Sequence, residues 1–159
     1  MEPRIVEVMA RDPAASVAPE PPMPDAAARA TAPGTGKAPT GGFAALVPEL
    51  GVTDLGESVR FWCDILDFAV AYDRPAARFA FLTRGPLQVM LYERNGRWET
   101  AEMHRPFGRG LNLQMRVARL APILAALEAA GWPLHEQPNE AWYRTGERES
   151  GQRIVSLRR

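Results

Sequence analysis

The segment LGVTDLGESVRFWCDILDF, residues 50–68, decides the fold. Asp54 and Glu57 stand three residues apart and form a capping-box pair, in which each side chain can satisfy a free backbone N–H of the first helical turn. Apolar residues then recur at spacings of four, three and four, which places them on one stripe of the helix: Leu55, Val59, Trp62 and Leu66. A helix with one apolar stripe needs a sheet against which to bury it.

Strand patterns flank this helix on both sides. Residues 43–52 are apolar enough for a strand, with Pro48 placing part of it at an edge or a bulge. Three short strands are predicted after the helix, at residues 68–73, 78–83 and 87–92, separated by turn sequences that contain Pro75 and Gly85-Pro86. The first unit is therefore predicted to be βαβββ.

A shift of 65 residues repeats the pattern. It places Leu50 on Met115, Val52 on Val117 and Leu55 on Leu120, which predicts a second unit of the same kind. Its predicted elements are a strand at 111–117, a helix at 120–130 closed by Gly131, and strands at 134–137, 141–145 and 153–157.

Residues 1–42 differ from the rest in composition. They hold eight of the fifteen prolines and ten alanines but no aromatic residue, so they offer little apolar surface to offset the entropy of ordering. A disordered Pro/Ala-rich tail is expected there, and one folded domain at 43–159. That domain divides into a first module at 43–93, a connector at 94–109 and a second module at 110–159.

Charge and cysteine content exclude several classes of function. Lysine plus arginine and aspartate plus glutamate number 19 each, so no net charge draws the 159-residue chain to nucleic acid or to a membrane surface. The sequence has no apolar run of bilayer length, no secretory signal and a single cysteine, Cys63, which is expected to be a buried thiol rather than a nucleophile. A cytoplasmic protein is expected.

Several motifs resemble one known family. They are VPEL at 47–50, VTDL at 52–55, FWCDILDF at 61–68, PFGRGLN at 106–112 and WYR at 142–144. In this order they look like the glyoxalase/bleomycin resistance protein/dioxygenase superfamily, also called vicinal oxygen chelate proteins, and most of all its bleomycin-resistance branch. The resemblance implies an α+β fold of two βαβββ modules, whose curved mixed sheets enclose a cleft, and a homodimer with ligand sites near its interface.

The positions at which this family holds its metal are altered. Its enzymes usually carry one histidine in the first strand of each module, where this sequence has Val47 and Asn112. Valine has no lone pair to donate, and an amide is a poor ligand for transition metals. Carboxylate ligands would come from the fourth strand of each module; Glu93 lies close to the first, and the second offers no obvious candidate. His104 and His135 fall outside the pattern, so no metal or other cofactor is expected.

The C-terminus also departs from the family. Members continue after the Gly-Gln-Arg stretch, here 151–153, through a turn and a final strand, whereas this chain ends at Arg159. The last strand of the second module is therefore expected to be missing, which would leave an unpaired sheet edge. In the alternative reading, the 65-residue shift lays 152–157 on 87–92, and this segment is itself the last strand.

These features predict a metal-independent protein that sequesters a small aromatic or cationic compound. The ligand-binding candidates are aromatic residues outside the helix stripe and one acid: Trp98, Phe107, Trp142, Tyr143, Tyr92 and Glu93. No catalytic residue is predicted. Two alternatives remain open, a metal-dependent glyoxalase-like or extradiol dioxygenase-like enzyme and a truncated, inactive relative.

Overall fold

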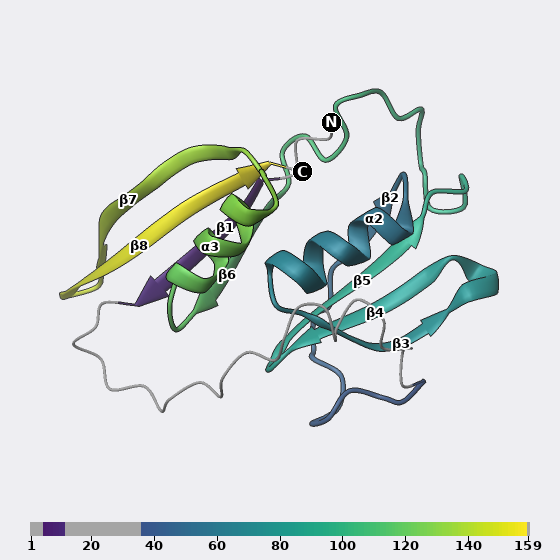
Figure 1. Ribbon diagram of the computed structural model, residues 1–159, viewed down its shortest axis with the longest axis horizontal. Coiled ribbons are helices and arrows are strands. Elements are labelled where there is room, and N and C mark those ends of the chain that lie inside the picture. The colour runs from purple at the N-terminus through teal and green to yellow at the C-terminus, as the bar shows by residue number, and fades with distance from the viewer. Residues whose placement is uncertain (1–4, 12–35, 159) are drawn as a thin grey trace. The chain divides into compact units, whose positions relative to one another are not determined.

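The computed structural model describes residues 5–11 and 36–158 (Figure 1). The chain divides into two compact units, one within 22–100 and one formed by 1–21 together with 101–159. We call their described parts the first module, residues 36–100, and the second module, residues 5–11 and 101–158. None of the helices among these residues is long and apolar enough to cross a membrane.

The first module is a four-stranded sheet with one helical segment between its first two strands in the chain. The sheet order is β2-β5-β4-β3, with β2 parallel to β5 and the other neighbours antiparallel. Its elements are β2 (Glu49–Val52), α2 (Leu55–Arg60), a π-helix (Phe61–Ile65), β3 (Ala69–Arg74), a 3-10 helix (Pro75–Ala77), β4 (Phe79–Arg84) and β5 (Leu87–Glu93).

Most predicted boundaries of the first module are confirmed to within a residue or two. The exception is the first strand, which begins at Glu49 rather than at residue 43. The second half of the predicted helix is a π-helix, in which Trp62 and Cys63 are buried, as expected for core residues. The predicted strand was too long because apolar character continues from Phe43 to Val47, although these residues do not pair in the sheet.

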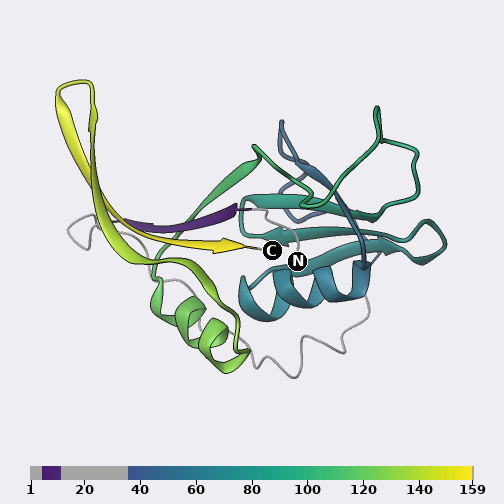
Figure 2. The same cartoon turned by 90° about the horizontal axis from the view of Figure 1, so that it is seen from above.

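The second module has the same layout. Its sheet order is β6-β1-β8-β7, with β1 parallel to β6 and antiparallel to β8 (Figure 2). The two strands predicted at 134–137 and 141–145 form one long strand, whose register shifts between Leu134 and Glu136 and again between Glu136 and Asn139. Gly131 follows the helix with φ +61, the left-handed conformation predicted for it. The elements are β1 (Ile5–Arg11), β6 (Asn112–Val117), α3 (Ala121–Ala129), β7 (Leu134–Thr145) and β8 (Arg148–Arg158).

Strand β1 corrects two predictions. Residues 5–11 were expected in a disordered tail, but they pair with β6 on one side and with β8 on the other. They take the place in this sheet that β5 takes in the first, so the fourth strand expected to be missing is present and comes from the N-terminal end of the sequence. Residues 1–4 and 12–35 of the predicted tail lie outside the described residues.

In each module, every second side chain along a strand points toward the helix, and these side chains form the core. In the first module Leu50, Val89, Leu91 and Leu82 are at most 5% exposed and face α2 and the π-helix. In the second module the corresponding face is formed by Val8, Met115, Val155 and Leu157, with Ile123 and Leu127 from α3 also buried. Both helices thus cover a sheet face of aliphatic side chains, as the stripe on the first helix predicted.

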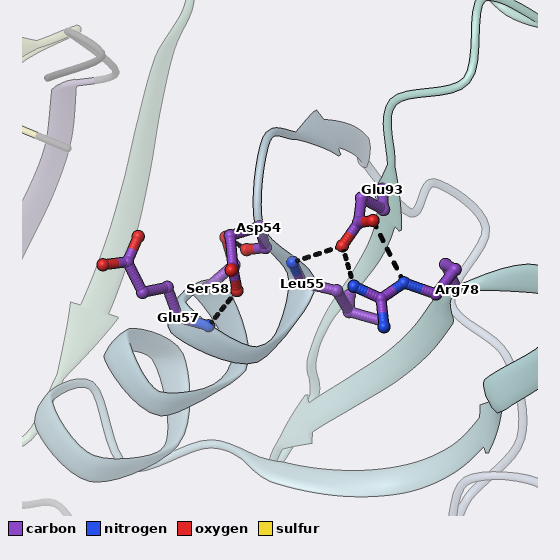
Figure 3. A network of polar contacts seen from close by, with 6 residues as sticks. All are labelled: Asp54, Leu55, Glu57, Ser58, Arg78 and Glu93. Carbon is purple, nitrogen blue, oxygen red and sulfur yellow. Dashed lines mark hydrogen bonds and ion pairs between the residues drawn. The ribbon is translucent and has the colours of Figure 1, made fainter.

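A polar network attaches the start of α2 to β5 (Figure 3). Asp54 caps the helix by accepting a hydrogen bond from the Glu57 backbone N–H at 2.7 Å, as predicted. Glu93 Oε2 accepts from the Leu55 backbone N–H at 3.2 Å, and Glu93 Oε1 accepts from Arg78 Nε at 3.1 Å. A second ion-pair contact joins Arg78 to Glu93 Oε2. The Glu93 carboxylate therefore satisfies a free helix N–H and pairs with Arg78 in the turn before β4.

The first prediction concerns pH. Hydrogen bonds from Arg78 and then from the Leu55 N–H hold the pKa of Glu93 below its ordinary value of 4.5. A lowered folded-state pKa stabilises the protein above the ordinary pKa, and this stabilisation is lost as pH falls through the folded-state value. Thermal melts should therefore show a lower melting temperature for Glu93→Gln than for wild type at pH 7, and a smaller gap near pH 3. An exposed control, Glu140→Gln, should match wild type throughout; an equal gap at both pH values would contradict the prediction.

The second prediction concerns β1. Val8 has 0% exposed surface, so Val8→Ala removes buried methyl groups and leaves a cavity. We expect a loss of about 2 kcal/mol in the free energy of unfolding, measured by urea denaturation. Leu46→Ala is the control, because Leu46 is 85% exposed. Its substitution should change the free energy by no more than about 0.5 kcal/mol. Equal stability of Val8→Ala and wild type would mean that β1 is not part of the folded sheet.

Candidate functional site

The six predicted ligand-binding residues divide equally between the modules. Tyr92, Glu93 and Trp98 belong to the first, and Phe107, Trp142 and Tyr143 belong to the second. Each module has one sheet face that its helix does not cover.

Sheet register arranges the uncovered face of the first module in two rows that cross all four strands. Side chains of one strand alternate between faces, and paired residues on neighbouring strands share a face. Because Leu91 and Glu93 face α2, their neighbours Met90 and Tyr92 face the other way. The first row is Glu49, Met90, Phe81 and Tyr72, and the second row is Gly51, Tyr92, Phe79 and Arg74.

Aromatic rings fill the middle of this face. The Tyr72 and Phe81 rings stack with centroids 5.0 Å apart and an interplanar angle of 15°. The Tyr72 and Phe79 centroids lie 6.0 Å apart. Phe79 and Phe81 are buried, whereas Tyr72, Met90 and Tyr92 are half-buried. We call the set Tyr72, Phe79, Phe81, Met90 and Tyr92 the aromatic face.

Gly51 makes room for Tyr92. A Cβ atom at position 51 would lie 2.6 Å from the Tyr92 hydroxyl oxygen, which is closer than real contacts allow. The ring of Tyr92 thus crosses the backbone of β2, and only glycine permits this approach. Tyr92 is the predicted candidate that the structure places on the aromatic face.

Opposite charges stand at the two edges of the aromatic face. The Arg74 guanidinium lies 4.7 Å from the Phe79 ring centroid and 5.6 Å from that of Tyr72, a cation–π arrangement at the β3 edge. Glu49, on β2, is exposed at the other edge. A compound on this face could therefore place a cationic group against Glu49 at the β2 edge and an anionic or polar group against Arg74 at the β3 edge.

A loop crosses the same face. Gln88, which shares this face with Met90, accepts a hydrogen bond from the Ala44 N–H at 2.8 Å and donates to the Gly42 carbonyl at 2.7 Å. Between these contacts the Phe43 ring meets Phe81 edge-on, with centroids 5.5 Å apart. Phe43 nevertheless remains 61% exposed. Its ring is thus loosely placed on a stacked aromatic pair.

Glu93 lies on the helix side of the sheet, opposite the aromatic face, and Trp98 lies in the connector. Both Glu93 carboxylate oxygens are engaged by the helix N–H and by Arg78, which fits a structural role for this residue. Trp98 is 57% exposed in the connector, with the Arg97 guanidinium 4.8 Å from its ring centroid. Nearby, a hydrogen bond from Arg94 lowers the pKa of Glu99.

The second-module candidates are also dispersed. Phe107 is buried, with the Arg105 guanidinium 5.3 Å from its ring centroid. Trp142 and Tyr143 are neighbours on β7, 61% and 51% exposed. The Trp142 ring lies over Gly151, where a Cβ atom would approach it to 2.8 Å. No observation joins these three residues into one site.

On the face of the second sheet that corresponds to the aromatic face, the aromatic residue among the described side chains is Tyr143, which pairs with Ser150 and lies outside the two rows that match the aromatic face. At the two matching rows, β6 carries Gln114 and Arg116, β8 carries Ser156 and Ile154, and β7 carries Glu136 and Asn139. The two modules therefore share a fold but differ in the chemistry of this face.

The residues present do not fit a metal site of the family's kind. Val47 and Asn112 offer no imidazole, and the Glu93 carboxylate is committed to Arg78 and the helix N–H. β1 adds one acid to the fourth strand of the second module, Glu7, which the prediction for that strand had missed. Within the described residues no group of three histidine, cysteine, aspartate or glutamate side chains could hold a metal ion.

Sequence reasoning missed four members of the aromatic face, Tyr72, Phe79, Phe81 and Met90, as well as Arg74 at its edge and Phe43, which contacts Phe81. The usable signal was the alternation within the predicted strands at 68–73 and 78–83, which puts Phe79 and Phe81 on one side. The missing information was the side of the sheet that the helix covers.

Solved structures similar to this chain include three bacterial or environmental proteins. A virulence protein from Salmonella typhimurium is 18% identical, with a TM-score of 0.47, over 73% of this chain and 95% of that chain. An integron cassette protein from the mobile metagenome of the Halifax Harbour sewage outfall is 23% identical, with a TM-score of 0.41, over 59% and 77%. A glyoxalase/bleomycin resistance protein/dioxygenase superfamily member from Vibrio splendidus 12B01 is 26% identical, with a TM-score of 0.28, over 69% and 91%.

Sequence comparison identifies the family. No curated protein matches this chain. Residues 42–148, more than half of the sequence, match the family described as Glyoxalase/Bleomycin resistance protein/Dioxygenase superfamily. The match agrees with the motifs at 47–68 and 106–112 and with the two modules of α+β structure. The chain belongs to the glyoxalase/bleomycin resistance protein/dioxygenase superfamily.

Proposed function

We propose that this protein binds a planar aromatic small molecule without a metal ion, in the manner of bleomycin-resistance proteins. The observation that carries the proposal is the aromatic face of the first module, where stacked rings lie beneath a loosely held Phe43. Aromatic rings provide large apolar contact area and favour stacked or edge-on geometry with other rings. A flat ligand is therefore the class of compound that this face recognises best.

The two rows set the ligand's size and charge. Four strands with spacings of about 4.8 Å give a face about 14 Å across, which suits two or three fused or linked rings. A cationic group on the ligand would pair with Glu49 at the β2 edge. A carboxylate or other acceptor would meet Arg74 at the β3 edge.

Phe43 is the group that such a ligand would displace. Its ring covers Phe81 edge-on while exposing 61% of its own surface, so its attachment buries little apolar area. A larger flat ring would bury more apolar area against the half-buried Tyr72, Met90 and Tyr92, at about 25 cal/mol for each Å² removed from water. Binding therefore exchanges a weak internal contact for a stronger one with the ligand.

The third prediction tests the aromatic face with metal-free bleomycin as the probe. Binding should raise the melting temperature of the full chain, and Tyr72→Ala should weaken it at least tenfold, measured by isothermal titration calorimetry. This reflects about 1–3 kcal/mol for the loss of one stacking ring. Glu49→Gln should weaken binding less, and salt should reduce that difference. Phe43→Ala should strengthen binding severalfold, because it removes the competing ring.

Trp142→Ala is the control, since Trp142 is an exposed aromatic residue of the second module. It should leave the dissociation constant unchanged. If Trp142→Ala abolished binding while Tyr72→Ala did not, the aromatic face would not be the site. An absence of binding by wild type would reject bleomycin as ligand, and a panel of planar cationic dyes would then test the class.

The fourth prediction separates a binding protein from a metal-dependent enzyme. Zinc, nickel, manganese and iron(II), each added alone in hundredfold excess over the protein, should leave the melting temperature within experimental error. A bound metal at a hundredfold excess over its dissociation constant would stabilise the protein by about 2.7 kcal/mol. A clear shift that disappeared in Asn112→Ala would favour the enzyme and overturn the proposal.

A further inference from the structure

The loop before β2 contacts the aromatic face in the way that a bound compound would. Phe43 places its ring edge-on against Phe81, with centroids 5.5 Å apart. The side-chain amide of Gln88 contacts the backbone on both sides of Phe43. It donates a hydrogen bond to the Gly42 carbonyl at 2.7 Å and accepts one from the Ala44 N–H at 2.8 Å. We call residues 42–44 the strap.

Gln88 holds the strap with a matched donor and acceptor. A glutamine amide carries a carbonyl oxygen and an NH₂ group, so it can accept from an N–H and donate to a carbonyl at the same time. The side chain of Gln88 lies two residues before Met90 on β5, and so on the same side of the sheet. Gln88 is therefore placed beside the aromatic face, where it can bind a carbonyl and an N–H that flank one aromatic ring.

A turn presents the strap to Gln88. The Gly42 N–H donates to the Pro39 carbonyl at 2.9 Å, and Gly41 has φ +91, as the third residue of a type II turn requires. Pro39 is buried, whereas residues 42–46 are exposed. The strap thus makes specific contacts but buries little surface of its own. A free compound that carries the same groups would compete with it for the same partners.

We propose that the aromatic face selects compounds in which one aromatic ring lies between an acyl oxygen and an amide N–H. N-acylated amides of aromatic amino acids have this arrangement, and Gln88 is the residue that selects them. The acyl oxygen takes the place of the Gly42 carbonyl, the amide N–H takes that of Ala44, and the ring takes that of Phe43. The inference rests on the proposed function and narrows its class of ligand.

Three contacts at separate positions also select the handedness of the compound. The ring meets Phe81, the acyl oxygen meets Gln88 Nε2, and the amide N–H meets Gln88 Oε1, as the strap does. These three groups branch from one carbon atom, so the mirror image of the compound cannot make all three contacts with the same geometry. Because the strap consists of L-amino acids, the L compound is expected to bind more tightly than the D compound.

NMR titration of the full chain tests the proposal, with N-acetyl-L-phenylalanine methylamide as the probe. An open-strap protein carries Phe43→Ala and Ala44→Pro, which remove the ring and the N–H donor of the strap. Dissociation constants come from the shifts of the Phe81 and Met90 amide signals. Gln88→Met in this protein should weaken binding of the L probe about tenfold, because two hydrogen bonds are lost. The D probe should bind severalfold more weakly than the L probe.

The control compound is 2-phenylethanol, which has the ring but no amide. Its dissociation constant should be the same with and without Gln88→Met, which also checks that the aromatic face is intact in this variant. The control variant is Gln137→Met, at an exposed glutamine of β7. It should leave the dissociation constants of both compounds unchanged.

The unaltered protein guards against misfolding of the open-strap variant. Wild type should bind the L probe severalfold more weakly than the open-strap protein, because the strap competes for Gln88. Bound probe should also speed the exchange of the Ala44 N–H with solvent, since it occupies the acceptor of that group. Equal binding by the two proteins, or bound probe with unchanged exchange at Ala44, would mean that the strap and the probe do not share a site.

The remaining outcomes separate this inference from the proposed function. The inference is wrong if Gln88→Met binds the L probe as tightly as its parent does, or if the L and D probes bind equally. It is also wrong if 2-phenylethanol or bleomycin binds while the L probe does not, and the proposed function then stands. If neither the probes nor bleomycin nor planar dyes bind, both the inference and the proposed function fail.

Discussion

The second module depends on the pairing of seven residues, Ile5–Arg11, with two strands that follow more than a hundred residues later. Buried backbone groups must be paired, so a sheet with a gap between β6 and β8 would lose hydrogen bonds along both edges as well as the burial of Val8. Connectivity does not impose this pairing. The same βαβββ layout is thus completed in the first module by a two-residue turn and in the second by a strand from the opposite end of the chain.

Both modules use one architecture for different surfaces. Aliphatic residues cover the helix-facing side of each sheet, because α3 and the π-helix that follows α2 each bury apolar side chains against it. On the other side, the positions held by Phe81 and Phe79 in the first module are held by Ser156 and Ile154 in the second. Core packing constrains one face in both modules, whereas the other face is free to differ. This asymmetry supports the placement of ligand binding on the first module.

Sequence patterns predicted the local elements well, because capping and periodicity are local properties. The Asp54–Glu57 pair located the start of α2, and the 65-residue repeat located the second module. β1 was not predicted, because composition averaged over 42 residues conceals a seven-residue apolar strand among prolines and alanines. Its partners are also too distant in sequence for any local pattern to reveal them. The C-terminal comparison correctly indicated that the second module needs a further strand, but not where that strand lies in the sequence.

The candidate site shows why aromatic residues alone are insufficient as a signal. Tyr92 and Glu93 are adjacent in β5, and adjacent strand residues point to opposite faces, so at most one of them can lie on a given surface. The hydrogen bond between Glu93 and the Leu55 N–H assigns Glu93 to the helix side. Tyr92 and Met90 therefore lie on the other side of the sheet. Their partners in β4, Phe79 and Phe81, lie on that same side because paired residues share a face. One contact at a helix N-terminus therefore fixes the side of the sheet on which Tyr92, Phe79, Phe81 and Tyr72 gather, and this assignment requires the fold rather than the sequence alone.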